Sequence, residues 1–138
     1  MSMMQRSKGK AGEREAAVML AQLTGLEVKR RVRQHDGDSD LEGIPNWSIE
    51  VKRYASATRS TIAGWWAQCV RQALATGQYP LLVYRLDRQA EWTCVWSAAL
   101  LNPALNQDID RLDRALFTAP AMWWELVKGS AKPGLLDA

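Results

Sequence analysis

The sequence is poor in residues that build disulfide and zinc sites, since its 138 residues include only two cysteines and one histidine. Cys69 and Cys94 lack the C-x-x-C spacing of thiol redox motifs and zinc ribbons, and both have apolar neighbours. We therefore expect them to be reduced core residues of a cytosolic protein. The single histidine, His35, disfavours hydrolases that rely on paired histidines or on histidine-bound zinc, and we expect it to be a solvated loop residue or at most a phosphate contact.

Long apolar runs are also missing. The longest is far too short to span a bilayer, and the N-terminus has no apolar segment of the signal-peptide type. A hydrophobic content of 47% is ordinary for a globular chain of this length, which is large enough to bury a core. We expect a single cytoplasmic domain over residues 1–138, with no membrane partner and no internal repeat.

Acidic residues, in contrast, flank a turn-rich link in the first half of the chain. Ile49 and Val51 alternate with Glu50 and Lys52, which is typical of a strand with apolar side chains on a core and a charged pair on its other face. An acidic run ends at Asp40, and a hairpin would bring one of its carboxylates beside Glu50. A lone carboxylate–lysine pair is more often a simple ion pair, but two converging carboxylates beside a lysine form a candidate divalent-metal site.

The same acidic run imitates a calcium-binding loop. Asp36, Asp38 and Asp40 have the spacing of the first three ligands. An EF-hand also needs glycine at the sixth position and glutamate at the twelfth, where this chain has Leu41 and Trp47. An EF-hand is therefore rejected.

Basic residues gather in the same half of the chain. The formal net charge is only +3, but the C-terminal third is balanced to acidic. A basic surface around an acidic pocket suits a polyanion that must reach a metal, whereas the alternative is an ordinary solvated face. The candidates for holding such a polyanion are Lys8, Lys10, Arg14, Lys29, Arg30, Arg31, Arg33 and Arg53.

Periodicity and turn signals predict an α/β fold with a mixed central sheet, in the order helix, three strands, helix, two strands. The expected elements are a helix at about 10–24, strands at 26–32, 40–44 and 47–54, a helix from 60 or 61 to 76, strands at 81–85 and 91–96, and helices at 97–101, 104–117 and 121–128. This divides the domain into a core at 8–96, a C-terminal helical extension at 97–130 and a loose tail at 131–138. Residues 1–7 are expected to be a disordered start.

Seven tryptophans stand out, among them the pairs Trp65-Trp66 and Trp123-Trp124. Adjacent residues on a helix point about 100° apart, so both members of a pair cannot face one core equally. Packing beneath the C-terminal helices and a dimer contact are both open for the second member, and base stacking is less favoured.

Four motifs in this order resemble those of the PD-(D/E)XK nucleases. Residues 8–15 (KGKAGERE) resemble a K-G-x-x-x-E-R-E helix start, Ser39-Asp40 stands in place of the P-D pair, Glu50-Val51-Lys52 matches E-x-K, and Gln68 matches a glutamine of related resolvases. The likeness covers about residues 8–85 and is greatest to the Holliday junction resolvase-like and phage endonuclease branches. Ser39 replaces the name-giving proline, which leaves Asp38 or Asp40 as the ligand; we favour Asp40 because it begins the apolar segment 41–44.

The resemblance implies a restriction-endonuclease-like αβββαβ core and a magnesium-dependent DNA endonuclease in which Mn²⁺ can replace Mg²⁺. It implies a homodimer that acts on branched DNA in a bacterial or phage-infected cell. The metal would be held by Asp40, Glu50, the Val51 carbonyl and Glu13. Lys52 would orient the attacking water or stabilise charge on the phosphate, and Gln68 would hydrogen-bond the site. One or two metals are both compatible with these ligands.

Other interpretations of the same residues remain open. Without the resemblance, Glu13 would be a surface acid favouring a helix start, and Gln68 a solvated helical residue. An endonuclease of this fold could instead be a nicking, repair or restriction-like enzyme. A non-catalytic DNA-binding protein or a protein-interaction module with a tryptophan-rich face is a further alternative.

Overall fold

The described part of the chain forms three helices and six strands. The computed structural model describes residues 3–32 and 38–129, with side chains from residue 9 onward. In chain order the elements are α1 (Met3–Thr24), β1 (Lys29–Arg30), β2 (Leu41–Glu42), β3 (Trp47–Tyr54), α2 (Arg59–Ala75), β4 (Tyr79–Leu86), β5 (Thr93–Ser97), β6 (Ala115–Thr118) and α3 (Pro120–Val127). Three 3₁₀ helices, η1 (Ala98–Leu100), η2 (Pro103–Leu105) and η3 (Leu112–Arg114), connect β5 to β6.

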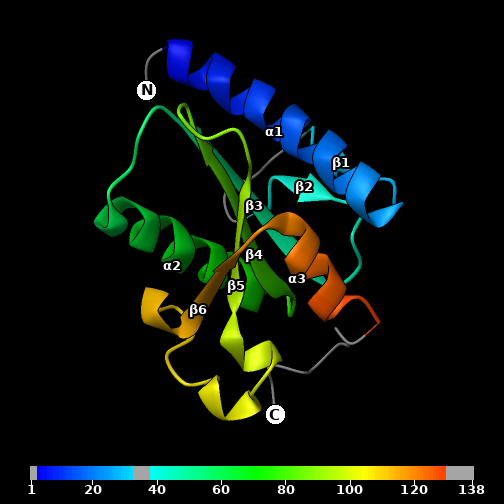
Figure 1. Ribbon diagram of the computed structural model, residues 1–138, viewed down its shortest axis with the longest axis vertical. Helices are drawn as coiled ribbons and strands as arrows, with labels where there is room; N and C mark the ends of the chain where they lie inside the picture. The colour runs from blue at the N-terminus through cyan, green and yellow to red at the C-terminus, as the bar shows by residue number, and fades with distance from the viewer. Residues whose placement is uncertain (1–2, 33–37, 130–138) are drawn as a thin grey trace.

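The strands form one mixed sheet in the order β1-β2-β3-β4-β5-β6 (Figure 1). β3 and β4 are parallel, with Trp47 beside Tyr79 and Tyr54 beside Leu86. All other neighbouring strands are antiparallel. A parallel pair needs a long crossover connection, and α2 supplies it. The mixed α/β sheet and the αβββαβ order predicted from the sequence are both confirmed.

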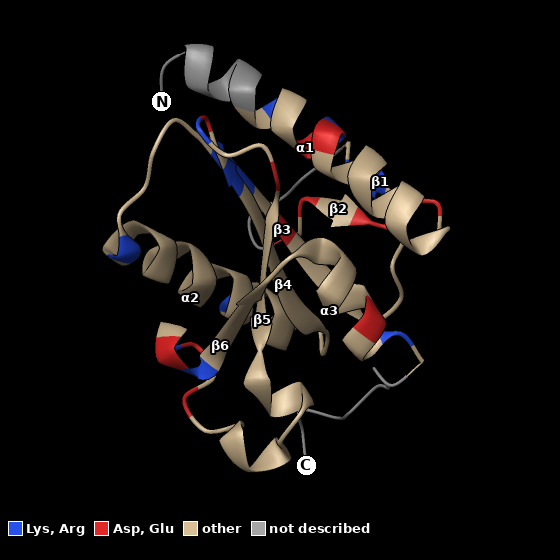
Figure 2. Ribbon diagram, viewed as in Figure 1, with Lys and Arg blue, Asp and Glu red and all other residues tan. Residues whose placement is uncertain are grey.

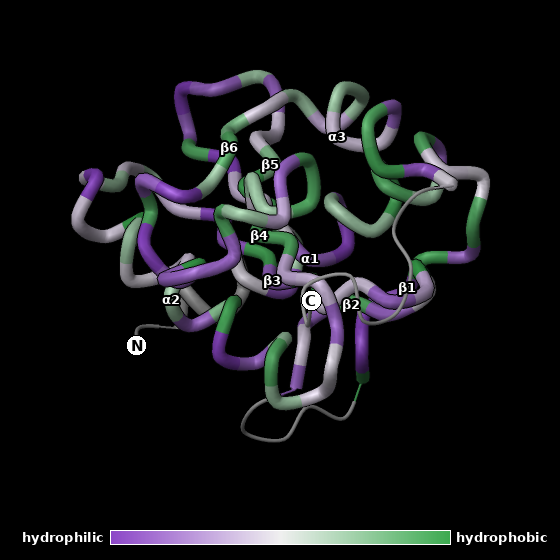
Figure 3. The backbone as a smooth tube through the Cα atoms, turned by 90° about the horizontal axis from the view of Figure 1, so that it is seen from below, coloured by the Kyte–Doolittle hydropathy of each residue, from purple (hydrophilic) through white to green (hydrophobic). Residues whose placement is uncertain are grey.

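Helices cover both faces of the sheet and bury two apolar clusters. On one face, Leu20 of α1 and Trp123 of α3 pack against Ile49. On the other face, Trp66 of α2 packs against Leu82. Figure 3 shows the apolar residues concentrated in the central strands, as expected for a strand such as β4 that is buried on both faces. None of the described helices combines the length and apolar character that a membrane span needs.

The tryptophan pairs are accommodated largely inside the domain. Trp65 and Trp66 are both buried, and the Trp66 ring nitrogen donates a 2.9 Å hydrogen bond to the carbonyl of Ile109 in the segment between β5 and β6. Trp123 is fully buried, and the half-buried Trp124 packs beside it with ring centroids 5.6 Å apart. Trp66 therefore lies beneath the segment between β5 and β6, whereas Trp123 and Trp124 pack from α3 against the core that contains α1.

The helix predicted at 104–117 is wrong, and so is a purely helical extension at 97–130. Residues 115–118 form β6, which pairs with β5 so that Cys94 lies beside Thr118. Asn and Asp residues interrupt the segment before it, and Asp108 adopts a φ of 56°, which breaks a helix. The edge of β5 then offers hydrogen-bonding groups to the Leu-Phe-Thr run, whose residues favour a strand.

The ends of other elements also differ from the predictions. Helix α1 already begins at Met3, so the disordered start is wrong from that residue on, and the predicted tail at 131–138 lies outside the described residues. Strands β1 and β2 are only two residues long. β2 ends at Glu42, just before Gly43, whose φ is 123° and where a Cβ atom would collide with the Glu27 carbonyl oxygen.

Candidate active site

Strand β3 separates apolar from charged side chains. Ile49 and Val51 belong to the core shared with α1, so Ser48, Glu50 and Lys52 point to the opposite face, towards α2. Glu50 is only 5% exposed. Its Oε1 atom lies 3.6 Å from the Lys52 ammonium nitrogen. A carboxylate and an ammonium thus share a largely buried face at the centre of the sheet.

Pairing of β2 with β3 brings Asp40 beside Glu50. Leu41 lies opposite Ile49, and the Asp40 N–H donates a 2.9 Å hydrogen bond to the Ile49 carbonyl. The Asp40 Oδ2 atom accepts a 2.8 Å hydrogen bond from the Val51 N–H. Of the two aspartates of the acidic run that the structure describes, Asp40 is therefore the one buried against β3.

Burial shifts both carboxyl groups towards the protonated form, and the charge of Asp40 adds to the shift of Glu50. Burial first, and then the charge of Asp40, raise the pKa of Glu50 to about 8, although Lys52 opposes the shift. Burial also raises the pKa of Asp40, against the lowering effects of the Val51 N–H, Glu50, Lys52 and Glu13. Two buried acids this close cannot both ionise easily unless a cation joins them.

A second observation, an unpartnered oxygen of Glu50, indicates that Asp40 and Glu50 suit a divalent metal. Among the described residues, Glu50 Oε2 has no hydrogen-bond partner although it is buried. A buried carboxylate oxygen is costly without a proton, a donor or a cation. Mg²⁺ commonly binds proteins through one or two carboxylates and keeps several waters. The described residues contain no cluster of three or more histidine, cysteine or acidic side chains suited to a metal, so Asp40 and Glu50 would be its main side-chain ligands.

Glu13 reaches the edge of this pair from helix α1. Its Oε1 atom accepts a 2.7 Å hydrogen bond from the Arg30 Nε, and the two side chains are 13% and 22% exposed. Glu13 also lowers the pKa of Asp40, which places the two carboxyl groups in contact. Arg30, a candidate for DNA contact from the sequence, is thus engaged in holding the third carboxylate of the site.

Gly12 allows this approach of α1, and the sequence patterns did not reveal its importance. A Cβ atom at Gly12 would lie 2.5 Å from the Cβ of Arg53, the residue after Lys52. Any larger side chain would push the helix away from β3, and with it Glu13. A glycine inside an otherwise helical pattern was the available signal.

Two other arginines are also tied to neighbouring parts of the site. Arg31 donates to the Ser39 carbonyl at 3.1 Å and pairs with Glu42 at 3.3 Å. Arg53 pairs with Asp87 at 2.6 Å. These arginines hold the segment before Asp40 and the end of β3. Figure 2 shows basic residues at the end of β3 that lies near α1.

The remaining basic candidates are more open to solvent. Lys10 and Arg14 are exposed on α1, and the exposed Lys29 pairs with Glu27 at 2.9 Å. The side chain of Lys8 and the whole of Arg33 lie outside the described residues, as does His35.

Helix α2 packs behind the acidic pair through Cys69. Burial, and then the charges of Glu50 and Asp40, raise the pKa of its thiol well above the usual range. Cys69 and Cys94 are both buried and free, as the sequence predicted. Gln68 precedes Cys69 and is half-buried, and its hydrogen bond to the site stays a prediction.

The melting temperature of Glu50→Gln should depend on pH in a defined way. The folded-state pKa of Glu50 is raised, so the folded protein holds this proton more tightly than the unfolded chain does. The stabilisation that this proton gives the wild type is fully present below the unfolded-state pKa of Glu50 and is lost as the pH rises through about 8. In metal-free buffer, the melting temperature of Glu50→Gln should therefore exceed that of the wild type by a margin that grows between about pH 5 and pH 8. Thermal denaturation across this range is the measurement. A difference in melting temperature that stays constant with pH would show that the pKa of Glu50 is not raised in the folded protein.

Comparison with known proteins agrees with the motifs. Residues 4–120 match the family described as "Phage putative PDDEXK endonuclease". The chain is 29% identical over 108 residues to Protein D14 of Escherichia phage T5, which covers 63% of this chain and 67% of that protein. It is also similar to the solved structure of Hjc, a Holliday junction resolvase of Archaeoglobus fulgidus, at 22% identity and a TM-score of 0.46 over 63% of this chain and 70% of that one. A structural likeness of this size says nothing about substrate. The family match spans most of the sequence, and the chain therefore belongs to this phage family of PD-(D/E)XK nucleases.

Proposed function

We propose that this nuclease is a magnesium-dependent DNA endonuclease with its catalytic centre at Asp40, Glu50 and Lys52. The observation that carries the proposal is the pair of buried, adjacent carboxylates with one unpartnered oxygen, Glu50 Oε2, and an ammonium group 3.6 Å from Glu50 Oε1. PD-(D/E)XK nucleases generally use divalent metals, and the donor set fits Mg²⁺, for which Mn²⁺ would substitute. We expect Asp40, Glu50 and the Val51 carbonyl to hold the ion, with Glu13 at its edge.

Each residue of the centre would have its own role in the hydrolysis of the phosphodiester. A bound divalent ion neutralises charge on the phosphate and lowers the pKa of a bound water. Lys52, at the rim of the acidic pair, would orient that water or stabilise the negative charge that develops on the phosphate. Arg30 would keep Glu13 in place, and the Val51 N–H would keep Asp40 in place. Gln68 would add a hydrogen bond from α2.

We further propose that the enzyme selects DNA by structure, acts as a homodimer and works in the cytoplasm of an infected cell. These finer points are supported by the motif order shared with resolvase-like nucleases. A cleavage assay on linear, nicked and four-way DNA, with and without Mg²⁺, is the test. Preferred cutting of four-way DNA only with Mg²⁺ is expected. Equal cutting of all three would favour a nicking or repair enzyme of the same fold, and binding without cutting would favour a non-catalytic module.

Exposed basic residues on α1 should hold phosphates without reading bases. Replacing Lys10 and Arg14 by alanine is expected to weaken binding equally for different sequences, because phosphate contacts carry no sequence information. It should also flatten the plot of log affinity against log salt by about 0.9 for each duplex phosphate that the variant no longer binds. Binding titrations at several salt concentrations measure both effects.

Two matched variants control for this result. Lys128→Ala removes an exposed lysine that follows α3 and should leave the slope unchanged. Arg30→Ala should lower the cleavage rate and leave the slope of the salt plot nearly unchanged, because Arg30 holds Glu13. A change of sequence preference at constant slope in the Lys10 and Arg14 variant would mean that these residues read bases.

A further inference from the structure

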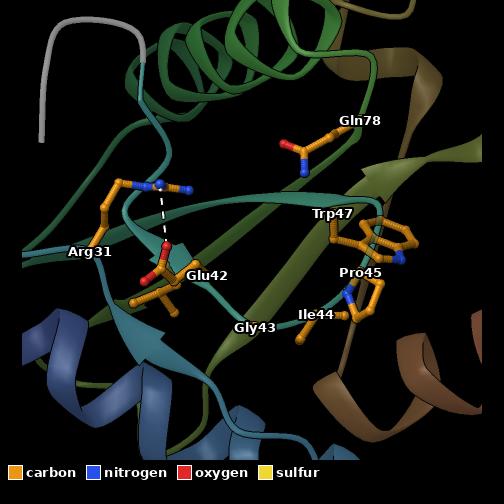
Figure 4. Close-up of a pocket in the computed structure, with 8 residues that line it drawn as sticks. Arg31, Glu42, Gly43, Ile44, Pro45, Trp47 and Gln78 are labelled. Carbon is orange, nitrogen blue, oxygen red and sulfur yellow. Dashed lines mark ion pairs between the residues drawn. The ribbon is translucent and has the colours of Figure 1, made fainter.

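A groove beside the proposed catalytic centre is not used by the mechanism above. It consists of two hollows that share Arg31 and Gln78. The first has a volume of about 270 Å³ and a floor that includes Ile44, Pro45 and Trp47 (Figure 4). Its floor is apolar, and its rim is polar.

The second hollow adjoins the first and is lined by residues that are near Asp40 and Glu50 in sequence. It has a volume of about 290 Å³, and its polar lining includes Ser39 and Ser48. Ser39 is the residue before Asp40, and Ser48 lies two residues before Glu50 on the same face of β3. With a rise of about 3.3 Å per residue, Ser48 in the second hollow lies about 7 Å along the strand from Glu50 and on the same face. A strand cut at the catalytic centre could therefore continue into the groove.

The side chain of Gln78 is oriented towards the first hollow. Its Oε1 atom and the Thr76 hydroxyl form a 3.0 Å hydrogen bond, which holds one end of the amide. The other end, the amide nitrogen, points into the hollow (Figure 4). No partner of this nitrogen is found in the part of the chain that the structure describes. A donor group held in place and left open is suited to an acceptor on a ligand.

The opposite rim carries a fixed ion pair. Arg31 is held by the Ser39 carbonyl and by Glu42, and its guanidinium group lies across the hollow from Gln78 (Figure 4). Because Glu42 offsets the charge of Arg31, this rim suits a neutral polar edge better than a phosphate. An apolar floor with polar groups around it is the usual form of a site for a flat, partly polar molecule.

We propose that this groove receives one unpaired base of the DNA strand, next to the phosphate that is cut. The proposal rests on the nuclease function and deepens it. Pro45, the exposed apolar side chain of the floor, would contact the face of the base, and Gln78 would donate to an acceptor on its edge. The face of a base in duplex DNA is covered by its stacked neighbours, so a base that packs against this floor must leave the stack, and the strand must be unpaired there. Selection of branched or frayed DNA would follow from this requirement.

Abasic scanning of DNA tests the proposal. A synthetic branched substrate with a single-stranded arm is prepared in a series in which each nucleotide near the branch is replaced in turn by an abasic residue. Affinity is measured with Ca²⁺ in place of Mg²⁺, and cleavage is measured with Mg²⁺. At one position, removal of the base should weaken wild-type binding at least about fivefold, because the hydrogen bond from Gln78 and the packing against the floor are both removed.

The variant Gln78→Ala should bind the intact DNA more weakly than the wild type does, and should distinguish intact from abasic DNA less, because only the packing against the floor remains. Gln78→Glu preserves the shape of the side chain and should show the same reduced distinction, because it replaces the donor by an acceptor. The control Gln22→Ala removes an exposed glutamine of α1 and should behave as the wild type. Melting temperatures of all variants show whether they are folded.

Two results would overturn the base site. The wild type could bind every abasic DNA as it binds the intact one, or Gln78→Ala could keep the full distinction. Both are binding results, so they are separate from a failure of the nuclease function, which would appear as intact binding with no cleavage of any substrate.

Discussion

Replacing Asp40 by asparagine or Glu50 by glutamine is expected to reduce magnesium-dependent cleavage by at least about a thousandfold, because each change removes a proposed metal ligand. DNA binding should survive in both variants. It should even tighten, since a negative charge near the phosphates is removed. Single-turnover cleavage and binding titrations on the same protein preparations measure the two effects. The Asp40 variant also keeps an oxygen that can accept the hydrogen bond of the Val51 N–H, so its fold should be preserved.

Two other acids serve as matched controls for these variants. Asp38→Asn changes the other aspartate that the sequence left open as a ligand, and Glu91→Gln changes an exposed acid before β5. Both are expected to cut at close to the wild-type rate. A fully active Asp40→Asn or Glu50→Gln enzyme, or an inactive Asp38→Asn enzyme, would show that the catalytic centre has been assigned to the wrong residues.

Replacing Lys52 by alanine is expected to lower the cleavage rate by at least about a hundredfold. This is the usual effect of losing a group that stabilises charge or handles a proton in the transition state. Lys52 is half-buried beside Glu50 and has no second acidic partner among the ion pairs of the described residues. Cation binding, followed by calorimetry with Ca²⁺, should remain in the variant. The combination of a reduced rate and a retained cation distinguishes a catalytic role from a structural one.

The matched control for Lys52 is Lys29→Ala, which removes an exposed lysine paired with Glu27. It should cut at nearly the wild-type rate. Lys52→Arg keeps the charge but changes its shape, and should recover only part of the rate. If Lys52→Ala were nearly as active as the wild type, the lysine would be only an ion-pair partner of Glu50.

The core of the candidate site could be predicted because its signals are local. Alternation of apolar and charged residues identified β3, and a short turn could place the end of the acidic run beside Glu50. The contact between Glu13 and Arg30 could not be read in this way. It joins a helix to an edge strand across 17 residues. Several arginines have the sequence context of exposed residues. The packing of α1 on the sheet decides which of them pairs with a buried carboxylate.

The C-terminal third shows the opposite outcome. The residues of 104–117 suit a helix by composition, yet 115–118 joined the sheet because β5 had an open edge. Whether such a segment forms a helix or a strand is decided by the neighbouring strand and not by its own composition. The groove at Gln78 was missed for a related reason, since its walls come from the β2–β3 turn and from the link between α2 and β4, which are far apart in sequence.

The central claim is that Asp40 and Glu50 together hold a divalent cation, and calorimetric titration of the metal-free protein with Mg²⁺ or Ca²⁺ tests it most directly. The wild type and Asp38→Asn are expected to bind the cation alike. Asp40→Asn and Glu50→Gln are expected to lose this binding while remaining folded by thermal denaturation. Equal binding by all four proteins, or a loss confined to Asp38→Asn, would contradict the proposed site.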